Sequence, residues 1–407
     1  MLVRVSSIDD STVTAYGLHD RFVLDLLATL TYGDRAHLDC RLATRTPPSQ
    51  TKDFRMNTAP TATMPTEIPR VSIVVIGRNE GERLVACLTS IAAMDSTGIA
   101  VETIYVDSAS TDGSPQRAAT MGARVIEACP ERPSAAFGRN AGWRAARGEF
   151  VLFLDGDTQL HPQFVQHALK EMRDPSVAVV WGHRRESLPQ QSVYVRVLDL
   201  DWAYATGPSE FCGGDALMRL DVLESVDGFD ASLIAGEEPE LCRRIRAAGH
   251  TILHIDAPMT LHDLAINRFG GYWKRAFRAG YAYAEVSARY QDSADPLWRA
   301  DARRNLFHGS LLLGMLALLP LTLLWPFVGM VVVIAAFGLI GRTFHRCAWK
   351  TANQKMRLLY ALHSHVQQIP ILAGQLSYHH DLWFGKRRGL IEYSYQTGVR
   401  TSERAPS

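Results

Sequence analysis

The stretch that decides the fold reads VSIVVIG over residues 71–77. A run dominated by β-branched residues and ended by a glycine is typical of a strand buried on both faces of a sheet. The same texture returns three more times, in ETIYVD (102–107), ARVIEA (123–128) and EFVLFLD (149–155). Helices are predicted between these strands, over about 80–93, from Ser110 and Thr111 onward, and over about 134–146. This alternation predicts βαβ units and an α/β domain built on a Rossmann-like, mostly parallel sheet.

Acidic side chains follow three of the predicted strands, at the point where each strand ends. Glu80 comes after the first strand, Asp107 ends the second, and Asp155 and Asp157 follow the fourth. Because ligands of open α/β sheets bind beyond the carboxyl ends of the strands, we expect these side chains to converge on one crevice. Each aspartate alone would fit a turn or a helix cap. Together they predict a site for Mg²⁺ or Mn²⁺, which bind carboxylates together with substrate phosphates.

Four segments carry a resemblance to a known family: VSIVVIGRNE (71–80), VDSASTDGS (106–114), GRNAGWRAARGEFVLFLDGDT (138–158) and GEEPELCRRIRAAG (236–249). With these motifs in this order, the chain resembles a membrane-associated, bacterial-type family 2 glycosyltransferase over about residues 71–290. The resemblance implies the GT-A fold of nucleotide-diphospho-sugar transferases and a nucleoside diphosphate sugar as donor. The motifs are specific for the family and do not name the sugar or the base.

The resemblance also implies which residues surround the nucleotide. Glu80 and Asp107 would lie beside the base and the ribose, and Arg139 would lie near the diphosphate or the base. Asp155, the first aspartate of the DxD motif, would contact the ribose. Ser108 is a departure from the family pattern, since many members have a second aspartate there.

The diphosphate and the donor sugar have their own set of implied contacts. Asp157, the second aspartate of the DxD motif, would bind the metal and the diphosphate. Gly213 and Gly214 would let the backbone approach the donor sugar, because glycine has no side chain in the way. His262 is a further metal-ligand candidate, as a late histidine is in some relatives. The alternative for His262 is a structural role.

Two adjacent glutamates are the candidates for the catalytic base. By the resemblance, Glu238 takes the position of the family's aspartate and would deprotonate the acceptor hydroxyl, with Glu237 as the second choice. The alternative is that both side chains only favour the start of a helix through its dipole. The implied reaction is an inverting, metal-dependent transfer. GYWKRAF (271–277) lacks the QxxRW motif of processive synthases, which favours transfer of a single sugar.

Residues 305–341 contain no Asp, Glu, Lys or Arg, which predicts a membrane segment. Pro320 and Pro326 would break a single long helix near its middle. Basic residues flank both ends, and Lys and Arg tend to stay on the cytoplasmic side. We therefore expect a hairpin or a re-entrant pair rather than one crossing, with the catalytic domain facing the cytoplasm at the inner membrane. A long buried core helix is the alternative.

The organisation that follows has four parts. Residues 1–68 read as a disordered arm, 69–292 as the GT-A domain, 293–396 as a membrane-associated helical region and 397–407 as a flexible tail. The arm has two interpretations: a regulatory segment, or an upstream extension if translation begins at Met56 or Met64.

The net charge is +1, from 43 Lys and Arg against 42 Asp and Glu, which argues against a nucleic-acid partner. The predicted function is transfer of one sugar to a hydroxyl of a lipid-linked or membrane-proximal glycan, in cell-surface or exopolysaccharide synthesis. Two alternatives stay open. One is a polyprenyl-phosphate glycosyltransferase, and the other is a catalytically idle membrane scaffold with the same fold.

Overall fold

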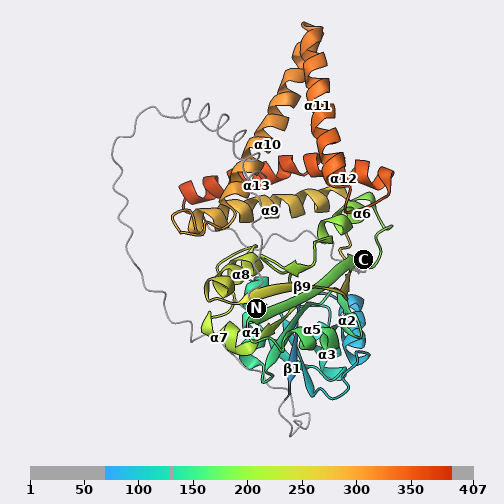
Figure 1. Ribbon diagram of the computed structural model, residues 1–407, viewed down its shortest axis with the longest axis vertical. Helices are drawn as coiled ribbons and strands as arrows, with labels where there is room; N and C mark the ends of the chain where they lie inside the picture. Colours follow the sequence, from blue (N-terminus) through green and yellow to red (C-terminus); the bar gives the residue numbers. More distant parts are fainter. Residues whose placement is uncertain (1–68, 129–132, 387–407) are drawn as a thin grey trace, which may run out of the picture. The chain divides into compact units, whose positions relative to one another are not determined.

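The computed structural model describes residues 69–128 and 133–386, so the predicted arm over 1–68 and the tail over 397–407 lie outside the described residues. Among the described residues, nine strands form one sheet in the order β3-β2-β1-β4-β8-β6-β9-β5, with β7 paired to β9 (Figure 1). The strands are β1 (Val71–Gly77), β2 (Val101–Asp107), β3 (Arg124–Glu127), β4 (Phe150–Asp155), β5 (Thr158–Leu160), β6 (Val177–Glu186), β7 (Gly207–Pro208), β8 (Ala216–Arg219) and β9 (Thr251–His262).

The first half of the sheet is parallel and confirms the predicted alternation. β1 pairs in parallel with β2 and β4, and β3 extends the sheet beyond β2. The connecting helices are α2 (Glu82–Ala92), α3 (Ser114–Thr120) and α4 (Ala135–Ala145). In the strand register Gly77 pairs with Asp107, and Ile76 pairs with Asp155. The three strands therefore end at one edge, as the sequence predicts.

The second half is mixed, so the sheet as a whole is not mostly parallel. β8 runs antiparallel to β4 and β6, β6 and β9 are parallel, and β5 and β7 run antiparallel to β9. Phe153 pairs with Ala216. Because β8 runs in the opposite direction to β4, its first residues lie beside the last residues of β4. The helices of this half are α5 (Phe164–Glu171), α6 (Val193–Asp199), η2 (Leu200–Trp202), α7 (Leu220–Ser225) and α8 (Glu237–Ala247).

Helix α3 begins at Ser114, later than the predicted start at Ser110. The amide of Ser110 donates to Asp107 Oδ2 over 2.7 Å, which holds this residue in the turn after β2. Asp112 then accepts hydrogen bonds from the amides of Ser114 and Gly81, at 3.0 and 2.9 Å. The polar residues that look like a helix start in the sequence are used instead to shape the loop beside the sheet edge.

Five helices follow the sheet: α9 (Phe269–Arg289), α10 (Arg299–Leu318), α11 (Pro326–Arg346), α12 (Gln354–Val366) and α13 (Gln368–Trp383). A 3₁₀ turn, η3 (Leu319–Leu323), joins α10 to α11, so the predicted break at the prolines is confirmed and the two helices form a hairpin (Figure 1). Residues 299–323 and 326–346 are each long and apolar enough to cross a membrane by length and composition.

Helix α12, which follows the hairpin, is hydrogen-bonded to the residue Asp201 in the turn η2, which follows α6. Tyr360 donates to Asp201 Oδ1 over 2.8 Å. Lys350, just before α12, donates to the carbonyl oxygens of Leu200 and Ala203 at 2.7 and 3.0 Å. Trp202 is the last residue of η2 and lines the cavity described below.

Candidate active site

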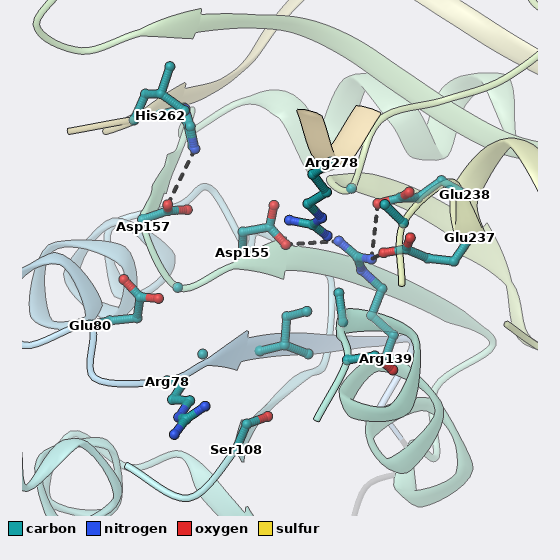
Figure 2. Close-up of a pocket in the computed structure, with 18 of the residues that line it drawn as sticks. Arg78, Glu80, Ser108, Arg139, Asp155, Asp157, Glu237, Glu238, His262 and Arg278 are labelled. Atoms are coloured by element: carbon teal, nitrogen blue, oxygen red, sulfur yellow. Dashed lines mark hydrogen bonds and ion pairs between the residues drawn. The ribbon is translucent and has the colours of Figure 1, made fainter. Parts of the chain in front are cut away.

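A cavity of about 390 Å³ opens at the edge where β1, β2 and β4 end. This volume lies within the range of about 300–1,000 Å³ that is usual for ligand pockets. Asp107 and Gly213, although predicted to bind the donor, do not line it. The predicted residues that do line it are Glu80, Arg139, Asp155, Asp157, Gly214, Glu237, Glu238 and His262, most of them visible in Figure 2.

Arg139 of α4 connects the two groups of carboxylates in this cavity. Its side chain is buried, and Nη1 lies 3.0 Å from both Glu237 Oε1 and Glu238 Oε1. Nη2 donates to Asp155 Oδ1 over 2.9 Å (Figure 2). A buried arginine surrounded in this way satisfies charges that would otherwise be costly to bury. The predicted contact of Arg139 with the diphosphate or the base stays a prediction.

Glu238 has the properties of a general base at the start of α8. Burial, together with the negative charge of Glu237, raises the pKa of Glu238 to about 7. A carboxylate with a pKa near the working pH can both accept a proton from an acceptor hydroxyl and release it afterwards. Both glutamates are paired with Arg139, but the side chain of Glu237 is 4% exposed and that of Glu238 is 18% exposed, so Glu238 is the more accessible from the cavity. Of the two glutamates, Glu238 is therefore the better placed for proton transfer.

Asp157 and His262 lie next to each other in the wall of the cavity, with His262 Nε2 3.3 Å from Asp157 Oδ2 (Figure 2). The other ring nitrogen of His262, Nδ1, lies 2.7 Å from Glu186 Oε1. A carboxylate that holds one histidine nitrogen in this way leaves the other nitrogen oriented as a metal ligand. Although burial opposes it, the interaction with His262 and the positive charges of Arg184 and Arg83 keep the pKa of Asp157 below its usual range, so its oxygens carry negative charge.

These residues fit a divalent metal that is also bound by the donor. Asp157 Oδ1 is buried and has no hydrogen-bond partner among the described residues, as expected of an oxygen that serves as a ligand of a cation. Nitrogen and carboxylate oxygen are suitable ligands for Mn²⁺. No group of three or more His, Cys, Asp or Glu side chains in the described part of the chain is arranged to hold a metal. The remaining ligands would come from substrate phosphates.

A second buried pair, which the sequence reasoning missed, supports Asp155 from behind. Asp215 accepts hydrogen bonds from the Asp155 amide at 3.0 Å and from Thr260 Oγ1 at 2.8 Å. Arg184 of β6 lies 3.2 Å from Asp215 Oδ2, and its guanidinium lies 4.5 Å from the ring centroid of Trp202. The sequence does contain a feature that could have pointed to this pair. The apolar strand VAVVWGHRRE (177–186) ends in charged residues, of which Arg184 and Glu186 are buried.

The remaining predicted donor residues lie at the end of the cavity formed by β1 and β2. Asp107 is buried and bonded to Tyr105 and Ser110, so it shapes the loop that carries the cavity-lining Ser108. Glu80 is paired with Arg83 at 2.6 Å. Burial and the nearby Asp157 raise the pKa of Glu80 to about 7.

Gly214 is the glycine that the geometry of the site requires. A Cβ at this position would lie 2.5 Å from Arg139 Nη2 and 3.0 Å from Asp155 Oδ2. At Gly213 the nearest atom would be 3.9 Å away, on Trp202. A side chain at Gly214 would therefore push apart the ion pair at the centre of the cavity.

The GT-A arrangement of the sheet, the paired aspartates at its edge and the buried glutamate opposite them define a glycosyltransferase that uses nucleotide sugars. The family model described as "Glycosyl transferase family 2" matches residues 72–220. A second model, "Glycosyl transferase family group 2", matches residues 150–344. The chain belongs to the family 2 glycosyltransferases.

Several curated relatives are similar to parts of the chain. Glycosyltransferase AglE of Haloferax volcanii is 24% identical over 234 residues, which cover 55% of this chain and 76% of that protein. The pre-mycofactocin glycosyltransferase of Mycobacterium tuberculosis is 26% identical over 41% of this chain and 38% of its own length. An N-acetylglucosaminyltransferase of Rhizobium leguminosarum is 27% identical over 42% of this chain and 44% of its own length. The chain thus spans less than half the length of the last two.

Among solved structures, the mannosyltransferase PcManGT from Pyrobaculum calidifontis, in complex with GDP-Man and Mn²⁺, is similar with a TM-score of 0.57. The sequence identity is 21%, and the match covers 80% of this chain and 90% of that chain. This similarity confirms the predicted GT-A fold. A shared fold does not by itself carry over a substrate.

Proposed function

We propose that this protein transfers a single sugar, with inversion, from a nucleoside diphosphate sugar to a hydroxyl of a lipid-linked or membrane-proximal glycan. The observation that carries this proposal is that Glu238 and the Asp157–His262 pair line the same cavity. One side of the cavity thus offers a base and the other a site for the metal and diphosphate. The product belongs to cell-surface or exopolysaccharide synthesis.

In the proposed reaction, Glu238 takes the proton of the acceptor hydroxyl. The oxygen attacks C1 of the donor sugar from the side opposite the nucleotide, and the bond from C1 to the diphosphate breaks. Arg139 keeps Glu238 beside Asp155 through its pairs of 3.0 and 2.9 Å. Such positioning reduces the entropic part of the barrier.

Asp157 and His262 are the proposed ligands of Mg²⁺ or Mn²⁺, with Glu186 orienting His262. When bound, the ion supplies positive charge to the departing diphosphate. Asp155, Glu80 and the backbone at Gly214 are the proposed contacts of the nucleotide and the sugar, with Asp107 and Gly213 acting from just outside the cavity lining. Of these, Asp107 would act through the loop it holds, because both its oxygens are bonded within the protein.

We assign residues 69–292 to the catalytic domain and 293–396 to a membrane-associated region. Leu323 and Phe337 in the α10–α11 hairpin are 87% and 72% exposed, which supports contact with lipid. Basic residues lie at both ends of the hairpin, including Arg303, Arg304, Arg342 and Arg346. By the positive-inside rule, they favour the inner membrane with the catalytic domain on the cytoplasmic side.

The test is a donor screen with the full chain in nanodiscs. The protein is incubated with Mn²⁺, a lipid extract of bacterial membranes and each of a set of UDP-, GDP- and dTDP-sugars, and products are identified by mass spectrometry. We expect one donor to add one sugar to a lipid-extractable acceptor. Addition of sugar chains would contradict single transfer, and absence of any product with every donor would contradict the proposed activity.

A further inference from the structure

Helix α9 brings two arginines into the cavity from the side opposite the sheet. Arg275, Arg278 and Ala279 line the cavity, and their spacing places them on one face of the helix. Arg278 Nη2 donates to the carbonyl of Ile234 over 3.2 Å. In Figure 2 Arg278 points toward Asp155 and Arg139. The guanidinium of Arg275 lies 5.8 Å from the ring centroid of Trp202.

The neighbouring residues of α9 lock the helix in this orientation. A Cβ at Gly280 would lie 2.0 Å from the carbonyl oxygen of Ile371 in α13. A Cβ at Gly374 of α13 would lie 2.1 Å from the carbonyl oxygen of Phe277. Helices packed as closely as this cannot rotate without separating. Arg275 and Arg278 are therefore held over the site by the same helices that adjoin the hairpin.

Arg139 and Arg184 also line the cavity, on the sheet side, where each is paired with a carboxylate. Arg139 is paired with Asp155, and Arg184 with Asp215. The proposed metal and donor diphosphate also lie on the sheet side, at Asp157 and His262. Arg275 and Arg278 place two further guanidinium groups in the cavity, on the side formed by α9. Guanidinium groups bind phosphate through paired hydrogen bonds.

We propose that Arg275 and Arg278 bind a phosphate of the acceptor, which makes the acceptor a lipid phosphate or a lipid diphosphate-linked sugar. This inference rests on the proposed function. Nine residues separate the end of α9 from the start of α10, the first apolar helix of the hairpin. In Figure 1 α9 lies between the sheet and the α10–α11 hairpin, so a phosphate on the side of the hairpin would meet α9 before the sheet. The two acceptor types share this phosphate and differ in the atom that takes the sugar.

The test compares Arg275→Gln and Arg278→Gln with Arg289→Gln. Arg289 lies on the same helix, is paired with Glu285 and does not line the cavity, so it controls for the loss of an arginine from α9. The full chain is placed in nanodiscs with increasing fractions of a polyprenyl phosphate. Binding of this lipid is measured by native mass spectrometry, and binding of the nucleotide identified in the donor screen is measured by calorimetry with Mn²⁺.

We expect Arg275→Gln and Arg278→Gln each to weaken binding of polyprenyl phosphate at least about tenfold, as charged hydrogen bonds are lost. Nucleotide affinity should change less than about twofold, and Arg289→Gln should match the wild type. An equal loss of nucleotide affinity would overturn the proposal, because the arginines would then bind the donor diphosphate. Unchanged lipid binding in both variants would overturn it as well.

Two further results distinguish the acceptor types and separate this inference from the proposed function. Glu238→Gln should abolish transfer to a sugar hydroxyl but leave transfer to a lipid phosphate largely intact, since an ionised phosphate needs no base. If the wild type binds polyprenyl phosphate through Arg275 and yet transfers no sugar from any donor, the proposed function fails while the phosphate site stands.

Discussion

The catalytic sheet and the α10–α11 hairpin are built from the same apolar residue types but place them in opposite environments. Val74 and Leu152 in the sheet are fully buried, whereas Leu323 and Phe337 in the hairpin are largely exposed. An exposed apolar surface of this extent marks a partner or a membrane. The chain's ordinary average of 47% hydrophobic residues thus combines two regions that require different surroundings. The two regions also differ in their expected roles. The carboxylates of the site belong to the sheet region, whereas the hairpin offers an apolar surface for attachment.

The largest effect should come from the base of the catalytic region. For a hydroxyl acceptor, Glu238→Gln should lower kcat by about 10²–10⁴-fold, the usual contribution of a general base. Because only the ionised form of Glu238 accepts a proton and its pKa is raised to about 7, the activity of the wild type should rise with pH through about 7. Rate measurements between pH 5.5 and 8.5 check this, and a pH-independent rate would contradict the assignment.

A charge in the hairpin tests the other side of the comparison. Phe337→Lys places a cation on the exposed apolar surface of α11, where insertion should cost about 2.5–3.5 kcal/mol at the middle of a membrane. The matched change in the catalytic domain is Leu188→Lys, at an apolar residue that is also exposed. Carbonate extraction of membranes should release more of the first variant and no more of the second than of the wild type. Equal retention of all three would argue that the hairpin is not in the bilayer.

Two glycines give a smaller contrast in packing. A Cβ at Gly142 of α4 would lie 2.2 Å from Val74 Cγ1 in the sheet, whereas a Cβ at Gly338 of α11 would meet nothing within 4 Å. Gly142→Ala should therefore destabilise the protein by about 1–3 kcal/mol through overpacking. Gly338→Ala should change stability by less than about 0.5 kcal/mol. Thermal unfolding in detergent measures both, and equal melting temperatures would show that the core adjusts without cost.

The smallest effect concerns the contact between the two regions. Tyr360→Phe removes the hydrogen bond from α12 to Asp201 and should cost about 0.5–1.5 kcal/mol. Because Asp201 adjoins Trp202 in the same turn, hydrogen exchange of residues 198–204 should become faster. Tyr378→Phe, on α13, is a control that leaves this bond in place. Exchange as slow as in the wild type would mean that α12 does not restrain the turn.

The parallel half of the sheet could be predicted because its signals are local. Each of β1, β2 and β4 is rich in β-branched, leucine or aromatic residues, and parallel pairing brings Asp107 and Asp155 to one edge whatever lies between them. The hairpin could be predicted for a similar reason. An uncharged stretch with prolines near its middle is recognised from its own residues, without knowledge of the segments that pack against it.

The rest depends on contacts between distant residues, which no local pattern records. The antiparallel course of β8 brings Asp215 to the amide of Asp155, 60 positions earlier in the chain. Arg139 meets Glu237, 98 positions later, so its burial among carboxylates could not be inferred from the GRN motif. Glu186 supports His262 across 76 positions. Side chains of this kind are found only when the fold places them together.

The central claim is that the sheet edge around Asp157 and His262 supports glycosyl transfer with a divalent metal. The most direct measurement compares sugar transfer by the wild type and by Asp157→Ala, in nanodiscs, with Mn²⁺ and with EDTA. We expect Asp157→Ala to lose at least about 100-fold in rate, and EDTA to reduce the wild type to the same level. Transfer by Asp157→Ala at the wild-type rate, insensitive to EDTA, would contradict the account.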